Sequence, residues 1–153
     1  MLKPGDTVDD FTLLDHTGAE TVWSNLRGRR CVFFFYPKAS TPGCTKEACA
    51  FRDMGGDFEA AGAAVFGASA DSVKRQSNFS NKNELTMPLL SDPDGVILKA
   101  WGVWGEKKMY GRTYEGIIRS TFVFDEDGKV LRVWSPVRVK GHVEEVLAYC
   151  QDL

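Results

Sequence analysis

Four cysteines, at positions 31, 44, 49 and 150, are the residues of this 153-residue chain with the widest chemical scope. Cys44 lies in a segment rich in Ser, Thr, Pro and Gly, directly after the apolar run 31–36. That run is β-prone and ends at Pro37, which is typical of a central strand covered on both faces. The pattern therefore places Cys44 where a buried strand gives way to a helix.

A cysteine in the first turn of a helix has neighbours that favour its ionised form. We expect Thr41 at the N-cap and Pro42 at the first helical position, where its missing N–H does no harm. The first-turn N–H groups and the helix dipole both favour an anion at this end. Because the thiolate is the nucleophilic form of cysteine, the spacing predicts a reactive sulfur at Cys44.

The elements that must position this sulfur alternate between strand and helix. Strands are expected over 11–15 and 20–23 as a hairpin, over 31–36, 63–69 and 88–91, and over 120–125 and 129–134 as a second hairpin. Helices are expected over 42–61, from 71 or 72 to 81, just before 101, and over 143–150. The pair Gly55–Gly56 is expected to interrupt the first of these helices or end it early. This order predicts an α/β fold of thioredoxin-like arrangement, with a mixed central sheet, helices on both faces and an N-terminal β-hairpin.

Composition and charge narrow the functional classes. With 43% hydrophobic and 26% charged residues, the chain suits one globular domain over 1–153. A net charge of −2 offers no basic footprint for nucleic acid and no cationic face for a membrane. The first ten residues lack the apolar region of a secretory signal, so we expect a cytoplasmic protein. With only two histidines, far apart in the sequence, no metal site is expected.

The segment 36–49 reads YPKASTPGCTKEAC. Its spacing Pro37-x-x-x-Thr41-x-x-Cys44 resembles the active-site signature of the peroxiredoxins. With Cys49 five residues further on, it is similar to the Q-type, or bacterioferritin-comigratory-protein, subfamily. The resemblance covers nearly the whole chain, because further landmarks follow in family order: FFFY at 33–36, SAD at 69–71, LLSD at 89–92, GVW at 102–104 and RSTFV at 119–123.

This resemblance implies a thiol peroxidase that reduces hydroperoxides without a metal or an organic cofactor. Cys44 is then the peroxidatic sulfur, which attacks a peroxide oxygen and becomes a sulfenic acid. The Thr41 hydroxyl, the Cys44 N–H and Arg119 are expected to stabilise negative charge on the departing oxygen, as donors and a fixed cation do. Pro37 is expected to close the pocket. Glu47 belongs either to the hydrogen bonds of the pocket or to the solvated surface of the helix.

The resemblance also makes Cys49 the resolving thiol, which forms an intramolecular disulfide that thioredoxin, or occasionally glutaredoxin, reduces. Five residues of α-helix separate two Cα atoms by roughly 8.6 Å, whereas a disulfide needs about 7 Å or less. We therefore expect residues 42–52 to unwind on oxidation. Cys31 and Cys150 are expected to be packing residues, with a reserve resolving role left open. A monomer is expected, as for many Q-type relatives.

Two other functions stay open at this point. A thioredoxin-like disulfide oxidoreductase acts on protein thiols but typically carries Cys-x-x-Cys at this junction, whereas four residues separate Cys44 from Cys49. A redox sensor or holdase needs no turnover at all. Arg119 can also be read as a surface cation at the start of a strand, in which case other arginines could take its role: Arg52, Arg112 or Arg138.

Overall fold

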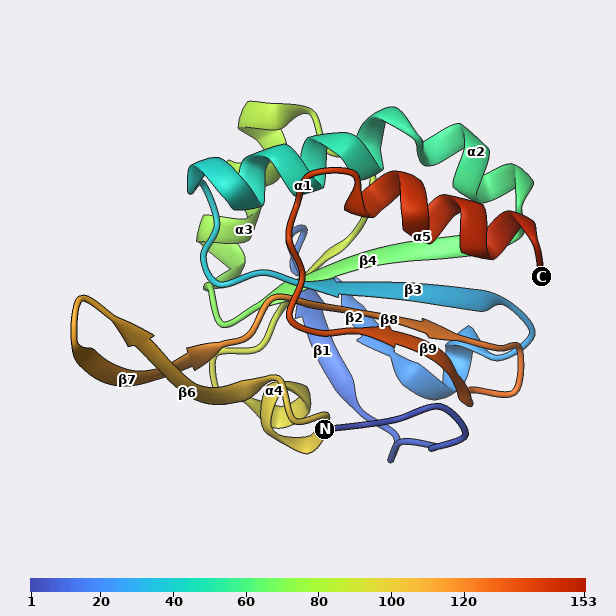
Figure 1. Cartoon of the computed structure of the whole chain (residues 1–153). Coiled ribbons are helices and arrows are strands. Elements are labelled where there is room, and N and C mark those ends of the chain that lie inside the picture. Colours follow the sequence, from blue (N-terminus) through green and yellow to red (C-terminus); the bar gives the residue numbers. More distant parts are fainter.

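The computed structural model describes residues 1–153, the side chain of Met109 excepted, around a seven-stranded mixed sheet (Figure 1). The strands lie in the order β2-β1-β5-β4-β3-β8-β9. Their bounds are β1 Thr12–Asp15, β2 Glu20–Val22, β3 Arg30–Phe35, β4 Ala63–Ser69, β5 Leu89–Ser91, β8 Ser120–Phe124 and β9 Val130–Trp134. Strands β3, β4 and β5 run parallel, whereas the other pairings are antiparallel. The predicted mixed sheet and N-terminal hairpin are confirmed.

Helices cover both faces of this sheet. Figure 1 shows α1, α2 and α5 above the sheet and α4 below it. Their bounds, with those of α3 and the 3-10 helix η1, are α1 Pro42–Asp53, α2 Gly55–Ala60, α3 Val73–Asn83, α4 Val96–Ala100, α5 His142–Gln151 and η1 Trp23–Leu26. No helix in the described part of the chain is both long and apolar enough to cross a membrane.

The central strand β3 supplies the core on both faces. Phe33 packs against Trp101 on the side of α4, with ring centroids 5.2 Å apart. Phe34 points the other way and stacks on Phe51 of α1 at 4.4 Å. Successive side chains of a strand alternate between faces, so a strand buried on both sides reads as one continuous apolar run. This is why residues 31–36 show no polar alternation.

The first long helix is divided where its sequence is weakest. Met54 ends α1 with φ −96° and ψ 8°, and α2 begins at Gly55. Two consecutive glycines cost helix stability because they lose more backbone freedom than other residues. The predicted interruption of the helix over 42–61 is therefore confirmed.

A second, two-stranded sheet was not predicted from the sequence. It is formed by β6 Trp104–Met109 and β7 Arg112–Ile117, which project from the body of the molecule as a hairpin (Figure 1). Tyr110 and Gly111 form its turn with φ 53° and 75°, as a two-residue type I′ turn requires. Most of β7 is exposed, so this hairpin lacks the apolar alternation that reveals a strand packed on a core.

Candidate active site

Cys44 lies in the first turn of α1, directly beyond the C-terminal end of β3, and is completely buried. The first backbone hydrogen bond of this turn runs from Thr45 N to Thr41 O at 2.9 Å. The N–H of Cys44 therefore precedes the helical ladder, among the donors that a helix leaves over at its N-terminus. The sulfur of Cys44 thus lies at the end of a 12-residue helix where the dipole is positive.

Arg119 reaches this sulfur from the neighbouring strand. In the antiparallel pairing of β3 with β8, Phe35 lies opposite Ser120, so residue 119 stands beside the loop that leaves β3. The Arg119 Nη2 group donates to Cys44 Sγ at 3.3 Å. The structure thus brings together two predicted site residues that are 75 positions apart in the sequence.

The guanidinium of Arg119 contacts both Glu47 and Cys44. Its Nη1 atom lies 2.8 Å from Glu47 Oε1, and its side chain keeps 17% exposure. Burial alone lowers the pKa of Arg119, but the charges of Glu47 and Cys44 outweigh burial, so this pKa is raised. The guanidinium therefore stays charged in its contacts with the buried sulfur and the Glu47 side chain.

Glu47 lies one helical turn after Cys44 and is completely buried. Burial raises the pKa of Glu47 to about 7, although the attraction of Arg119 acts in the opposite direction. Its Oε1 atom accepts from Arg119, whereas Oε2 is buried without a hydrogen-bond partner among the described residues. Of the two readings of Glu47, the structure favours a pocket residue that orients Arg119 over a solvated helix surface.

Thr41 occupies the N-cap position of α1, but its side chain does not cap the helix. The Thr41 hydroxyl donates instead to Lys38 O at 2.8 Å. A hydroxyl has one hydrogen, so its lone pairs remain to accept a hydrogen bond. The lone pairs of Thr41 are thus available to a hydrogen-bond donor, and its expected role as a donor to the departing oxygen stays a prediction. Pro37, half-buried, stands at the start of the same turn.

Cys49 lies in the same helix as Cys44 and is half-buried. Its thiol faces Asn83 Oδ1 at 3.9 Å, and all four cysteines are free. Helix α1 is continuous through both positions, so about 7.5 Å of helical rise separates them. A disulfide between these two sulfurs is incompatible with an intact α1.

The remaining two thiols are buried in opposite layers of the core. Cys31 belongs to the cluster on the α4 side and Cys150 to the cluster on the α1 side. Burial raises the pKa of each thiol to about 11, against the lowering influence of Arg27 and Arg29 on Cys31 and of Arg30 on Cys150. Both thiols are therefore protonated at neutral pH, which fits packing residues.

Lys107 is a second cation near the site, and the sequence pattern did not single it out. It lies on β6, and its Nζ donates to Ile117 O at 2.8 Å. Burial lowers the pKa of Lys107, the positive charge of Arg119 lowers it further, and Cys44 raises it. Lys107 was not predicted as a residue near the site because the hairpin that carries it was not predicted.

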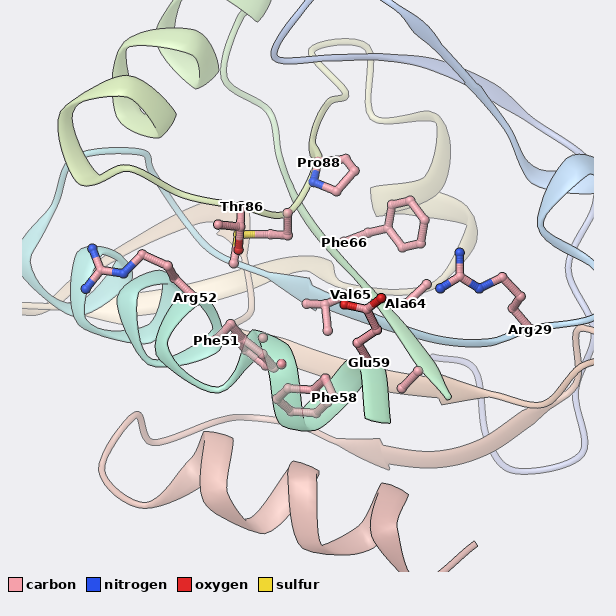
Figure 2. A pocket seen from close by; sticks show the side chains of 14 residues that line it. Arg29, Phe51, Arg52, Phe58, Glu59, Ala64, Val65, Phe66, Thr86 and Pro88 are labelled. Atoms are coloured by element: carbon pink, nitrogen blue, oxygen red, sulfur yellow. The ribbon is translucent and has the colours of Figure 1, made fainter. Parts of the chain in front are cut away.

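A cavity of about 490 Å³ lies beside the other end of α1. Figure 2 shows Arg52 and Arg29 at opposite ends of it, with Phe51, Phe58 and Phe66 between them. The cavity occurs along the first half of β4, which pairs with β3 on one side but has no partner on the other, since β5 pairs only with the second half. It contains none of the five predicted site residues. No cluster of three or more potential metal ligands occurs among the described side chains.

Comparison with known proteins places these residues in a wider context. The family described as "AhpC/TSA family" matches residues 4–133. A putative peroxiredoxin of Mycobacterium tuberculosis is 52% identical over 145 residues, which cover 95% of this chain and 92% of that protein. Peroxiredoxin Bcp of Escherichia coli K12 is 40% identical over 151 residues, covering 99% and 97%.

Solved structures show the same relationship. The bacterioferritin comigratory protein of Xanthomonas campestris, described for its alkyl peroxide reduction activity, superposes with a TM-score of 0.89 at 41% identity. The match covers 93% of this chain and 90% of that one. A cysteine-to-serine mutant of PrxQ from Xylella fastidiosa gives a TM-score of 0.95 at 35% identity, with 99% and 97% covered. The predicted thioredoxin-like fold is confirmed by these neighbours.

Proposed function

This chain belongs to the AhpC/TSA family, as a peroxiredoxin of the Bcp, or Q, type, and we propose that Cys44 is the sulfur with which it reduces hydroperoxides. Members of this family are thiol peroxidases, so the chain is an oxidoreductase. One observation carries the assignment: Cys44 lies in the first turn of a helix, and Arg119 Nη2 contacts its sulfur at 3.3 Å.

In the first step the Cys44 thiolate attacks one oxygen of a hydroperoxide, ROOH, and the O–O bond breaks. Cys44 becomes a sulfenic acid, and the other oxygen leaves and is protonated to an alcohol or, from hydrogen peroxide, to water. Arg119 and the Cys44 N–H stabilise the negative charge that develops. Thr41 accepts a hydrogen bond from the peroxide O–H and so orients the substrate. Pro37 covers the sulfur and limits the access of water.

In the second step the Cys49 thiol displaces hydroxide from the sulfenic sulfur, which gives a Cys44–Cys49 disulfide and water. Because both cysteines lie on α1, its first turns unwind before the bond closes. Because α1 ends at Met54, the unwinding need not extend into α2. A dithiol protein, thioredoxin or glutaredoxin, then reduces the disulfide by thiol exchange.

The proposed substrates are hydrogen peroxide and organic hydroperoxides. The alkyl peroxide reduction activity in the description of the Xanthomonas relative supports the organic class. Sulfur is the redox centre, so the reaction needs no metal and no organic cofactor. We also propose a monomer that works in the cytoplasm, where dithiol reductants keep such cysteines reduced.

Mass spectrometry after one equivalent of hydrogen peroxide tests this assignment. The wild type is expected to contain one disulfide, between Cys44 and Cys49, and to consume peroxide continuously when thioredoxin, its reductase and NADPH are supplied. Cys44→Ser is expected to abolish consumption. Cys49→Ser is expected to complete one turnover, accumulate sulfenic and then sulfinic acid, and fail to cycle with thioredoxin.

Cys150→Ser is the matched control, because it removes a buried thiol from the same core cluster as Cys44. It is expected to cycle as the wild type does. Unimpaired cycling of Cys49→Ser, or a disulfide that includes Cys31 or Cys150, contradicts the proposed resolving role. Disulfide reductase activity without peroxide consumption favours the thioredoxin-like oxidoreductase instead.

A further inference from the structure

The carboxylate of Asp71 holds the turn that leads into α1, residues 37–41, by a hydrogen bond to its backbone. The Asp71 Oδ2 atom accepts a hydrogen bond from Ala39 N at 2.8 Å and a second from Ser69 Oγ at 2.6 Å. Ala39 and Asp71 are each 8% exposed, and Ser69 is completely buried. Asp71 stands outside the group formed by Cys44 and Arg119, so its influence on them passes through this turn.

The turn needs such a constraint because of Ser40. Its φ of 66° lies in the left-handed region, which a residue other than glycine occupies only where its surroundings impose it. On one side of Ser40, the N–H of Ala39 is fixed by Asp71. On the other side, the hydroxyl of Thr41 is fixed by Lys38 O. The conformation of this turn therefore sets the position of Thr41 and of the helix start that follows.

The orientation of Asp71 is itself fixed by a chain of buried polar groups. Gln76 Nε2 donates to Ser69 Oγ and to Leu90 O, both at 2.9 Å. The Tyr36 hydroxyl donates to Gln76 Oε1 at 2.5 Å. Buried polar networks whose members are satisfied specify one arrangement, because any alternative leaves a group without a partner. The network joins the ends of β3, β4 and β5 to the turn.

We propose that Asp71 is a positioning residue for peroxide reduction: by holding the N–H of Ala39 it fixes the turn that aims Thr41 and Cys44 at the substrate. This inference rests on the proposed role of Cys44. A single oxygen of Asp71 accepts both bonds, whereas the other, Oδ1, lies 4.0 Å from the exposed guanidinium of Arg75. An exposed ion pair contributes little, so the two hydrogen bonds, and not the charge, hold the turn. An asparagine at this position, with its carbonyl oxygen in the place of Oδ2, keeps both bonds.

The test compares two reactions of Cys44 in the full-length chain. One is its oxidation by hydrogen peroxide in a single turnover; the other is its alkylation by iodoacetamide, which needs the thiolate but not the orientation of a peroxide. Asp71→Ala is expected to slow peroxide oxidation by about ten- to a hundredfold, as misplaced groups do, and alkylation by less than about threefold. Asp71→Asn is expected to stay within about threefold of the wild type in both reactions.

Asp92→Ala is the matched control for lost stability. Asp92 is completely buried and accepts hydrogen bonds from three first-turn N–H groups of α4. Its removal is expected to lower the melting temperature while leaving the ratio of the two rates unchanged. A merely structural role of Asp71 predicts the same unchanged ratio for Asp71→Ala, and that outcome overturns the inference.

Two further results decide the remaining cases. If Asp71→Asn is as slow with peroxide as Asp71→Ala, the charge matters and the hydrogen-bond argument is wrong. If Asp71→Ala does not fold, Ser69→Ala takes its place, because it removes the donor that orients Asp71; a smaller loss in the same direction supports the inference, and an unchanged ratio overturns it. If Cys44 of the wild type is not oxidised by peroxide, the proposed function itself is wrong, and this outcome is distinct from a failure of the Asp71 inference.

Discussion

Arg119 holds one guanidinium against two groups, the sulfur of Cys44 and the carboxylate of Glu47. The contact with Cys44 is the one that peroxide chemistry needs, and the contact with Glu47 fixes its direction. A fork of donors suits this double task, because an ammonium group is a single point of charge. The geometry of the guanidinium, and not its charge alone, therefore matters here.

Replacement of Arg119 separates the effect of its charge from that of its geometry. Arg119→Met, which keeps the bulk, is expected to lower kcat/KM for hydrogen peroxide by about 10²- to 10³-fold, the usual loss when a donor to a developing oxyanion is removed. Arg119→Lys restores the charge but not the fork, so partial recovery is expected. Stopped-flow tryptophan fluorescence measures both. Full activity of Arg119→Met would show that a different cation serves Cys44.

Glu47 makes stability depend on pH. Its pKa is raised from 4.5 to about 7 on folding, so the folded protein binds this proton more tightly than the unfolded chain does. Stability is therefore expected to fall as pH rises from about 4.5 to about 7. Glu47→Gln removes this dependence, because glutamine does not titrate.

Thermal unfolding at pH 5 and pH 8 measures the effect. The melting temperature of the wild type, relative to Glu47→Gln, is expected to be lower at pH 8 than at pH 5. Glu59→Gln, an exposed change on α2, is the control and is expected to track the wild type. A constant difference between the wild type and Glu47→Gln across this range would contradict the raised pKa.

At the scale of elements, helix α1 carries both reactive cysteines and contacts Arg119 at its first turn. A Cβ atom added at Gly43 would lie 3.3 Å from Arg119 Nη2, tighter than an ordinary contact. The flexible guanidinium is the group that would move. The absence of a side chain at Gly43 therefore provides the space through which Arg119 approaches Cys44.

Gly43→Ala separates helix stability from activity. Alanine is the better helix former by up to about 1 kcal/mol, so the melting temperature is expected to stay the same or rise. The displaced guanidinium is expected to lower kcat/KM for peroxide several-fold. Gly56→Ala, whose Cβ would meet nothing within 4 Å, is the control and should keep full activity. A fully active Gly43→Ala would show that the contact is loose.

Oxidation is expected to be visible as loss of α1. In the reduced protein its backbone N–H groups are protected by helical bonds, whereas closing Cys44–Cys49 requires those bonds to open. Hydrogen exchange over 42–53 is expected to quicken on oxidation and to recover on reduction, while α5 stays protected. An oxidised protein with an unchanged exchange pattern in α1 would contradict the unwinding. Cys49→Ser, which cannot form the bond, is the control.

At the scale of the whole molecule, the sheet separates Cys31 from the other three thiols, which lie on the α1 side. Cys31 and Cys150 are nearly fully buried, with each pKa near 11. Excess peroxide is expected to oxidise Cys44 and Cys49 and to leave the other two as thiols until the protein unfolds. Differential alkylation before and after denaturation, read by mass spectrometry, checks this. Oxidation of Cys150 in the native protein would reopen its reserve role.

The order of elements around β3 could be predicted from the sequence because each has a clear local signal. The apolar run of β3, the paired glycines after α1 and the turn before β9 depend on neighbouring residues alone. The hairpin β6–β7 has no such signal, because most of β7 is exposed and the described residues of β6 are only half-buried or exposed. A local pattern of apolar residues reveals a strand only where one of its faces is buried, and little of this hairpin is buried.

The candidate site divides in the same way. Cys44 at a helix start follows from the local pattern, and its partners Arg119 and Cys49 were expected from family resemblance. The direction of the Thr41 hydroxyl could not be predicted, since it depends on the exact path of one turn. The link from Asp71 to Ser69, Gln76 and Tyr36 joins residues up to 40 positions apart, and no short pattern contains it.

Apart from each other, β6 and β7 make no extensive contact with another element of the described chain. Yet their base leads directly to Arg119, and Lys107 lies on the arm itself. The base of the hairpin is anchored in the core through Ile117 and Trp104, whereas its tip at Tyr110 is exposed. The length of the tip is therefore expected to vary without disturbing the core. Insertions and deletions at this tip are thus expected to be tolerated by the fold, whereas changes near Lys107 alter the charge beside Arg119.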